Sequence, residues 1–122
     1  MSGFGFPKAA RVLRRSDFRK VYDEGFRVSS PCFAAFCLKR ADSGPGVGPD
    51  GPRIGFTVTK ALGKSVVRNR MKRRLREAVR LHLGELPAGW MIVFNGRKAL
   101  LEVEFSVIER EVGKVFARCA NS

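Results

Sequence analysis

A cluster of arginines between residues 65 and 83 has the composition and spacing needed to bind phosphate groups. The segment reads SVVRNRMKRRLREAVRLHL, and its apolar residues recur at the spacing of an amphipathic helix, with Ser65 as the expected N-cap. On a helical wheel, one side gathers Val67, Met71, Leu75, Ala78, Val79 and His82. The other side carries Arg68, Lys72, Arg73, Arg76 and Arg80, with Arg70 and Arg74 on the flanks. A guanidinium group can hold a phosphate with two hydrogen bonds and can stack on a base. The pattern therefore predicts a helix that packs on a sheet and presents arginines to nucleic acid.

The whole chain is strongly basic. Residues 1–122 suit a single domain, and 24 Lys and Arg against 11 Asp and Glu give a net charge of +13. Such a surface favours a polyanionic partner, with nucleic acid the first candidate and an anionic membrane surface the second. No segment has the run of about 20 apolar residues that crosses a membrane, and the N-terminal residues lack the apolar core of a signal peptide. We therefore expect a cytoplasmic protein.

Residue sets for protein-based catalysis are missing from the sequence. His82 is the only histidine, and it falls beside the apolar side of the predicted helix. Cys32, Cys37 and Cys119 form no CxxC pair, so we expect reduced, mostly buried thiols and no metal site. No carboxylate pair, metal-ligand cluster or nucleophile–base set stands out. We therefore expect no catalytic residue in the protein itself.

Other elements follow from periodicity and composition. The expected strands are residues 27–39, 53–60 and 90–95, the last a continuous apolar run typical of a central strand. Helices are expected at residues 17–23 and 103–118. The order is helix, strands, basic helix, strand, helix. It predicts an α+β fold, a two-layer sandwich of helices against one mainly antiparallel sheet.

The N-terminal third combines a basic arm with an aromatic helix. Residues 1–15 read as an extended basic arm, and Ser16 is the expected N-cap of the helix that follows. Phe18 and Tyr22 are four residues apart and therefore share a face of that helix. Residues 41–52 are crowded with Gly and Pro, which predicts a flexible loop between two strands.

The sequence closely resembles the bacterial ribonuclease P protein family in the run Lys60-x-x-Gly63-x-x-Val66-x-Arg68-Asn69-Arg70-x-Lys72-Arg73-x-x-Arg76-Glu77. The segment SDFRKVYDEGFRVSSPCF is similar to the family's first helix and first strand. The segment IVFNGRKA, with the amphipathic helix after it, is similar to its last strand and helix. Two positions depart from the family pattern: Ala61 stands where many members have a second basic residue, and Ser65 replaces the more usual Ala.

This resemblance implies a topology and a function. The implied order is α-β-β-β-α-β-α, with a left-handed strand–helix–strand crossover that the usual right-handed rule would not predict. The protein would bind the catalytic RNA of ribonuclease P and the 5′ leader of precursor tRNA. Mg²⁺ held mainly by the RNA would hydrolyse the phosphodiester and release the mature 5′ end. The protein would then be an accessory subunit with no organic cofactor and no obligate protein partner.

Matching positions assign roles to individual residues. The contacts to the catalytic RNA are expected from Arg68, Asn69, Arg70, Lys72, Arg73 and Arg76. The leader is expected in a cleft between the first helix and the sheet, formed by Phe18, Tyr22, Phe36, Lys60, Lys64, Arg97 and Lys98. Auxiliary contacts are expected from the arm residues Arg11, Arg14 and Arg15. Aromatic faces stack on any base while cations follow the backbone, which suits leaders of varied sequence. Packing of the three aromatic residues in the core is the alternative.

Two other functions remain open at this point. A different nucleic-acid-binding module, such as a ribosomal protein or a DNA-binding protein, would use the same basic helix and would stimulate no ribozyme. A metal-dependent nuclease would cleave RNA without any RNA partner.

Overall fold

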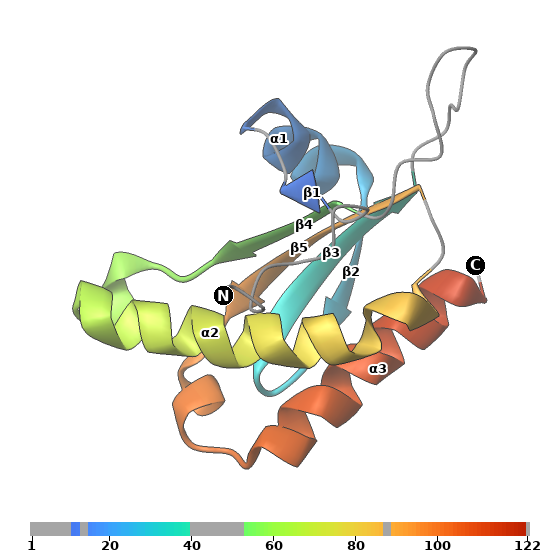
Figure 1. Ribbon diagram of the computed structural model, residues 1–122. Coiled ribbons are helices and arrows are strands. Elements are labelled where there is room, and N and C mark those ends of the chain that lie inside the picture. The colour runs from blue at the N-terminus through green and yellow to red at the C-terminus, as the bar shows by residue number, and fades with distance from the viewer. Residues whose placement is uncertain (1–10, 13–14, 40–52, 87–88, 122) are drawn as a thin grey trace.

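The strands form one five-stranded sheet with helices on both faces (Figure 1). The computed structural model describes residues 11–12, 15–39, 53–86 and 89–121. The strands are β1 (Arg11–Val12), β2 (Phe26–Ser29), β3 (Phe33–Lys39), β4 (Arg53–Thr57) and β5 (Trp90–Gly96). The helices are α1 (Arg15–Glu24), α2 (Ser65–His82) and α3 (Phe105–Ala120), with short 3-10 turns at Lys60–Leu62, Leu83–Glu85 and Lys98–Leu101. The α+β class is confirmed, and the short strand β1 precedes the expected order of elements.

Strand β5 lies at the centre of the sheet, as its apolar run predicts. The strand order is β1-β4-β5-β3-β2. Pairings β2–β3 and β3–β5 are antiparallel and include most of the paired residues, whereas β1–β4 and β4–β5 are parallel. The sheet is therefore mixed, with its parallel part around β4. Helix α2 connects the parallel neighbours β4 and β5, and the hand of this crossover stays a prediction from the family resemblance.

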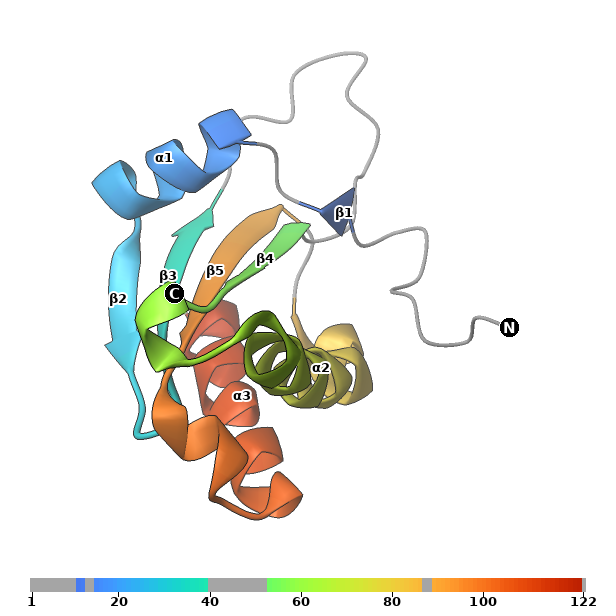
Figure 2. The same ribbon diagram turned by 90° about the vertical axis from the view of Figure 1, so that its left-hand side faces the viewer.

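The two faces of the sheet carry different helices. Side chains alternate along a strand, so Ile92 and Phe94 of β5 belong to the large core under α2 and α3. Met91 and Val93 belong to a smaller cluster with Val21 of α1 on the other face. Figure 2 shows α1 on one side of the strands and α2 with α3 on the other. The sheet with α2 and α3 forms the expected two-layer sandwich around the large core. Helix α1, on the other face of the sheet, adds a partial third layer that was not expected.

Residues 27–39 form a hairpin, not the single strand expected from their composition. Strands β2 and β3 run antiparallel, and Ser30, Pro31 and Cys32 connect them. The backbone N–H of Ser30 donates to the carbonyl of Phe33 at 2.9 Å, and the N–H of Cys32 donates to the Ser30 hydroxyl at 3.2 Å. Pro31 has no N–H to offer a strand ladder, so Ser-Ser-Pro is a turn signal inside an otherwise strand-like segment.

Several predicted ends shift by a few residues. Helix α1 begins at Arg15 and already includes Ser16, and α2 begins at Ser65 with Lys64 as its N-cap and no side-chain cap bond. Neither serine is therefore the N-cap that its type suggests. Strand β4 ends at Thr57, before the expected residue 60. The 41–52 loop and most of the 1–15 arm lie outside the described residues.

Candidate nucleic-acid interface

Helix α2 buries the apolar side that the helical wheel predicts. The basic side differs from the prediction, because Arg68 and Lys72 are half-buried and Arg70, expected on a flank, is exposed. The buried residues of the helix are Met71, Leu75, Ala78 and Val79. Asn69, Arg70, Arg73 and Arg76 are exposed, and Arg68 and Lys72 are half-buried. We call these six residues the basic face of α2. The core fixes the apolar side against the sheet, so these side chains are carried by a rigid element.

The arginines of α2 divide into engaged and unengaged groups. Arg74 donates from its two terminal nitrogens to the carbonyls of Leu100 and Val103, each at 2.7 Å. Arg80 binds the Glu77 carboxylate, which lowers the pKa of Glu77. Within the described part of the chain, Arg70 and Arg73 have no hydrogen-bond or ion-pair partner. The unengaged cations are the ones available to phosphate.

Two residues of the basic face also have structural contacts. Arg68 donates from Nε to the carbonyl of Gly63 at 3.1 Å, which ties the start of α2 to the preceding turn. The guanidinium carbon of Arg76 lies 5.6 Å from the centre of the Phe56 ring, in a cation–π contact with β4. Both side chains are therefore pre-positioned near the surface, which reduces the entropy lost on binding.

The three predicted aromatic residues of the cleft come together between α1 and the sheet. Tyr22 is 40% exposed, and its ring meets that of Phe36 edge to face with the ring centres 4.9 Å apart. Phe18 and Phe36 are half-buried and pack against the cluster of Val21, Met91 and Val93. We call Phe18, Tyr22 and Phe36 the aromatic patch. Tyr22 is exposed, as leader binding requires, whereas Phe18 and Phe36 pack partly in the core. The patch therefore combines the two alternatives that the sequence allows, a binding surface and core packing.

Polar residues also lie beside the aromatic patch, and none of them is predicted as part of the site from the sequence. The Tyr22 hydroxyl donates to Oδ1 of Asn95 at 2.8 Å, and the Thr57 hydroxyl donates to the same oxygen. The guanidinium of Arg27 lies 5.9 Å from the centre of the Phe36 ring. One signal was present in the sequence. Asn95 ends the apolar run of residues 90–95 and lies two residues after Val93, so the two side chains share one face of the strand.

The expected phosphate clamps are only partly free. Lys60, Lys64 and Lys98 are exposed. Arg97 instead donates to the Ser30 carbonyl at 2.7 Å and to the Ser29 hydroxyl at 3.3 Å, so it holds the β2–β3 turn. Of the auxiliary arm, Arg14 lies outside the described residues, and so do the side chains of Arg11 and Arg15.

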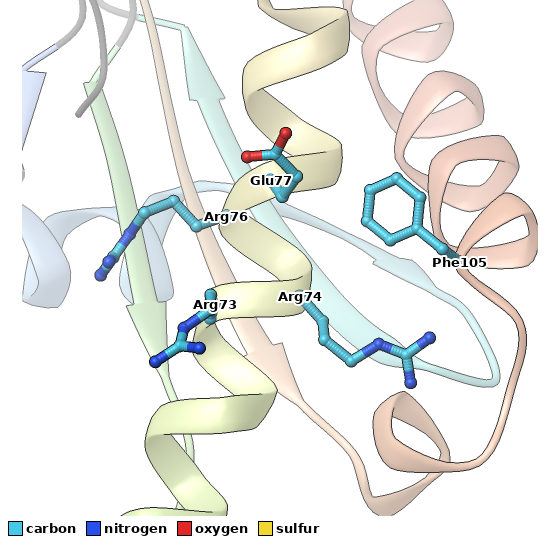
Figure 3. A pocket seen from close by; sticks show the side chains of 5 residues that line it. All are labelled: Arg73, Arg74, Arg76, Glu77 and Phe105. Carbon is cyan, nitrogen blue, oxygen red and sulfur yellow. The ribbon is translucent and has the colours of Figure 1, made fainter. Parts of the chain in front are cut away.

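A pocket of about 680 Å³ lies on α2 beside the start of α3. Its lining residues are Arg73, Arg74, Arg76, Glu77 and Phe105. In Figure 3, Phe105 projects from α3 toward α2, and Arg74 leaves α2 on the same side. Arg73 and Arg76 leave α2 on the opposite side, toward β4 (Figure 3). We call this feature the α2–α3 pocket.

Titratable groups elsewhere have structural partners. Nδ1 of His82 lies 2.7 Å from Glu85, and Nε2 lies 3.2 Å from Glu109 of α3. All three cysteines are free and buried, as expected from the sequence, and a hydrogen bond with Cys119 and burial raise the pKa of the Cys37 thiol. In the described ranges, no group of three or more His, Cys, Asp and Glu is arranged to hold a metal ion. No helix among those residues is long and apolar enough to span a membrane.

The family model described as Ribonuclease P matches residues 6–120. The chain belongs to the ribonuclease P protein family. A ribonuclease P protein component from Symbiobacterium thermophilum is 39% identical over 111 residues, which are 91% of each chain. One from Desulfosudis oleivorans is 34% identical over 116 residues, which are 95% of this chain and 90% of the relative.

Solved structures agree with this assignment. The ribonuclease P protein from Thermotoga maritima has a TM-score of 0.73 and 30% identity, and the match covers 88% of this chain and 96% of that one. These findings confirm the family resemblance and support the ribonuclease P function over the ribosomal-protein alternative. The chain is an accessory protein subunit of a ribonucleoprotein endoribonuclease, and its partner is an RNA.

Proposed function

We propose that this chain, acting as one RNA-binding domain, binds the catalytic RNA of ribonuclease P through the basic face of α2. One observation carries the proposal. Within a single helix, the apolar residues are buried while Arg70 and Arg73 are exposed and have no partner in the described part of the chain. Each phosphate that such a cation neutralises releases a condensed counterion, which drives association. Asn69, between Arg68 and Arg70, can donate and accept hydrogen bonds and thus adds specificity without charge.

The aromatic patch is the proposed site for the 5′ leader of precursor tRNA. The exposed ring of Tyr22 offers a stacking surface, and Phe36 supports it edge to face. Stacking contributes about 1–3 kcal/mol per base and depends little on sequence, so one patch can serve many leaders. The exposed Lys60 and Lys64 are the proposed contacts to leader phosphates, since they lie on the turn between β4 and α2.

The proposed reaction is hydrolysis of the phosphodiester between the leader and the mature tRNA. Mg²⁺ ions bound by the catalytic RNA would supply the activated water. The protein adds positive charge where RNA phosphates crowd together, which lowers the Mg²⁺ concentration that assembly requires. The proposed location is the cytoplasm, where precursor tRNA is made in bacteria.

Precursor-tRNA cleavage at low Mg²⁺ tests this function. The reaction is measured with the cognate ribonuclease P RNA alone, with the protein alone, and with both. We expect cleavage at low Mg²⁺ only when both are present, and we expect the gain to shrink as the leader is shortened. Folded protein that fails to stimulate the cognate RNA would refute the proposal, and cleavage by the protein alone would assign the chemistry to the protein.

A further inference from the structure

The α2–α3 pocket has the wall chemistry of a site for a flat organic ring. Phe105, the first residue of α3, is half-buried against the core and exposes the rest of its ring to the pocket. The aliphatic stem of Arg74 adds apolar surface on the same side of α2 as Phe105, because its charged end is held at the carbonyls of Leu100 and Val103. The volume of about 680 Å³ lies within the range of small-molecule sites.

The three arginines that line the pocket differ in whether they already have a contact inside the protein. Arg74 is committed to the carbonyls of Leu100 and Val103, so it builds the wall next to Phe105 and holds no ligand charge. Arg76 lies over the ring of Phe56. Within the described part of the chain, Arg73 alone among the three lining arginines has no internal contact.

The carboxylate of Glu77 decides what enters the pocket. It repels a phosphate, so the phosphate belongs at Arg73, on the side of α2 away from Phe105. Arg80 holds Glu77 in two hydrogen bonds, but a carboxylate has about four acceptor positions. The remaining positions suit the amino group of a nucleobase, and the ring of Phe105 suits its face.

We propose that the α2–α3 pocket binds one unpaired nucleobase of the RNA partner, stacked on Phe105, with the adjoining phosphate held by Arg73. The RNA segment then crosses α2 from the side of α3 to the side of β4 and does not follow the helix axis (Figure 3). This inference rests on the proposed function and adds to the basic face a site that recognises a base.

The first test compares RNA affinity of Phe105→Leu with that of the unchanged protein. Leucine keeps an apolar side chain against the core and removes the stacking surface. We expect binding of the ribonuclease P RNA transcript to weaken about 5-fold or more, with an unchanged dependence on salt, because stacking releases no counterions. The matched control is Phe26→Leu, another half-buried phenylalanine that lies outside the pocket and contacts Trp90.

A second variant gives a direct optical signal. In Phe105→Trp, the new indole is in the pocket, while the native Trp90 is 3% exposed and shielded from RNA. We expect the added fluorescence to be quenched when the transcript binds, whereas Leu81→Trp, at a 50% exposed position of α2 outside the pocket, keeps its emission. Unquenched emission at position 105 with saturating RNA would overturn the proposal even if Phe105→Leu were unstable.

The outcomes separate the pocket from the general function. If the unchanged protein neither binds nor stimulates the RNA, the proposed function itself fails. If the unchanged protein does both and Phe105→Leu matches it in affinity, only the nucleobase site is refuted. The nucleobase site would also be refuted if Phe105→Leu lowered both the affinity for RNA and the dependence of that affinity on salt, because a lost phosphate contact has both effects.

Discussion

Arg70 and Arg73 can bind RNA without breaking a hydrogen bond to any described residue. Arg74 and Arg80 cannot. They would have to release a carbonyl or a carboxylate, whereas Arg70 and Arg73 have no partner within the described residues. A cation without an internal partner exchanges a counterion for a phosphate and gives up nothing else. An arginine on α2 is therefore more strongly expected to contact RNA when no internal hydrogen bond competes for its guanidinium group.

Arg70→Ala should weaken RNA binding by removing one phosphate contact. We expect the slope of log affinity against log salt to fall by about 1 unit, because one fewer counterion is released. The measurement is a binding titration with the ribonuclease P RNA over a range of salt concentrations. Arg110→Ala is the control, since Arg110 is an exposed cation on α3 beside Glu111. Equal slopes for the unchanged protein and Arg70→Ala would remove Arg70 from the interface.

Tyr22 tests whether the aromatic patch binds the leader by stacking. Tyr22→Ala should reduce affinity of the holoenzyme for precursor tRNA by about 1–3 kcal/mol and leave affinity for mature tRNA unchanged. Tyr22→Phe keeps the ring and loses only the hydrogen bond to Asn95, so its affinity should stay close to that of the unchanged protein. An equal loss with both RNAs would contradict leader binding, and a full loss with Tyr22→Phe would transfer the role to the Asn95 network.

At the scale of elements, the link between α2 and the turn before α3 depends on one side chain. Arg74→Ala removes two charged hydrogen bonds and leaves the carbonyls of Leu100 and Val103 without their donors. We expect a loss of about 2–4 kcal/mol in the free energy of unfolding, measured by urea titration. Arg73→Ala, one residue earlier and without such bonds, should change it by less than about 0.5 kcal/mol. Similar stabilities for the two variants would show that the Arg74 bonds contribute nothing net.

Elements with a long repeating pattern were predictable, and elements defined by distant contacts were not. The apolar positions of α2 recur over the whole helix, so its buried side follows from the sequence alone. Composition does not predict the β2–β3 turn, because the apolar residues on either side of Pro31 are typical of one continuous strand. The face occupied by α1 could not be read either, since Val21 packs on Met91 and Val93, some 70 residues later in the chain.

Site prediction follows the same division. Local spacing predicts the cations of the basic face, and the family resemblance adds Asn69 and the grouping of Tyr22 with Phe36. The contact of Asn95 with Tyr22 depends on strand register and is predicted by neither. The structural role of Arg74 is not visible in the sequence, because its two acceptors lie in and just after the 3-10 turn before α3, more than 25 residues away. The role of an ionisable residue is therefore hard to predict from the sequence when its partner lies on another helix, strand or turn.

For the molecule as a whole, His82 makes stability depend on pH near neutrality. Burial lowers the pKa of His82, but hydrogen bonds and charge interactions with Glu85 and Glu109 outweigh burial and raise it above the ordinary 6.5. The folded state thus holds this proton more tightly than the unfolded state. The stabilisation is complete below pH 6.5 and is lost as the pH rises through the folded pKa.

Urea unfolding across this window, at pH 5.5 and pH 7.5 for instance (about one unit on either side of an unperturbed histidine), measures the effect. We expect the unchanged protein to lose stability between the two conditions, and His82→Gln to lose less, since His82 is the only histidine in the chain. An identical loss in His82→Gln would assign the pH dependence to other groups.

Adjacent residues of β5 support opposite sides of the molecule. Phe94 belongs to the core beneath α2 and α3, and Asn95, the next residue, binds the hydroxyl of Tyr22. With RNA at both proposed sites, helix α2 and the sheet beneath it would together separate the ribozyme from the leader. A paired central strand neither stretches nor slides, because a shift by one residue would turn every side chain to the wrong face. The spacing between the two proposed RNA sites would then be fixed by the fold and would be the same for every leader.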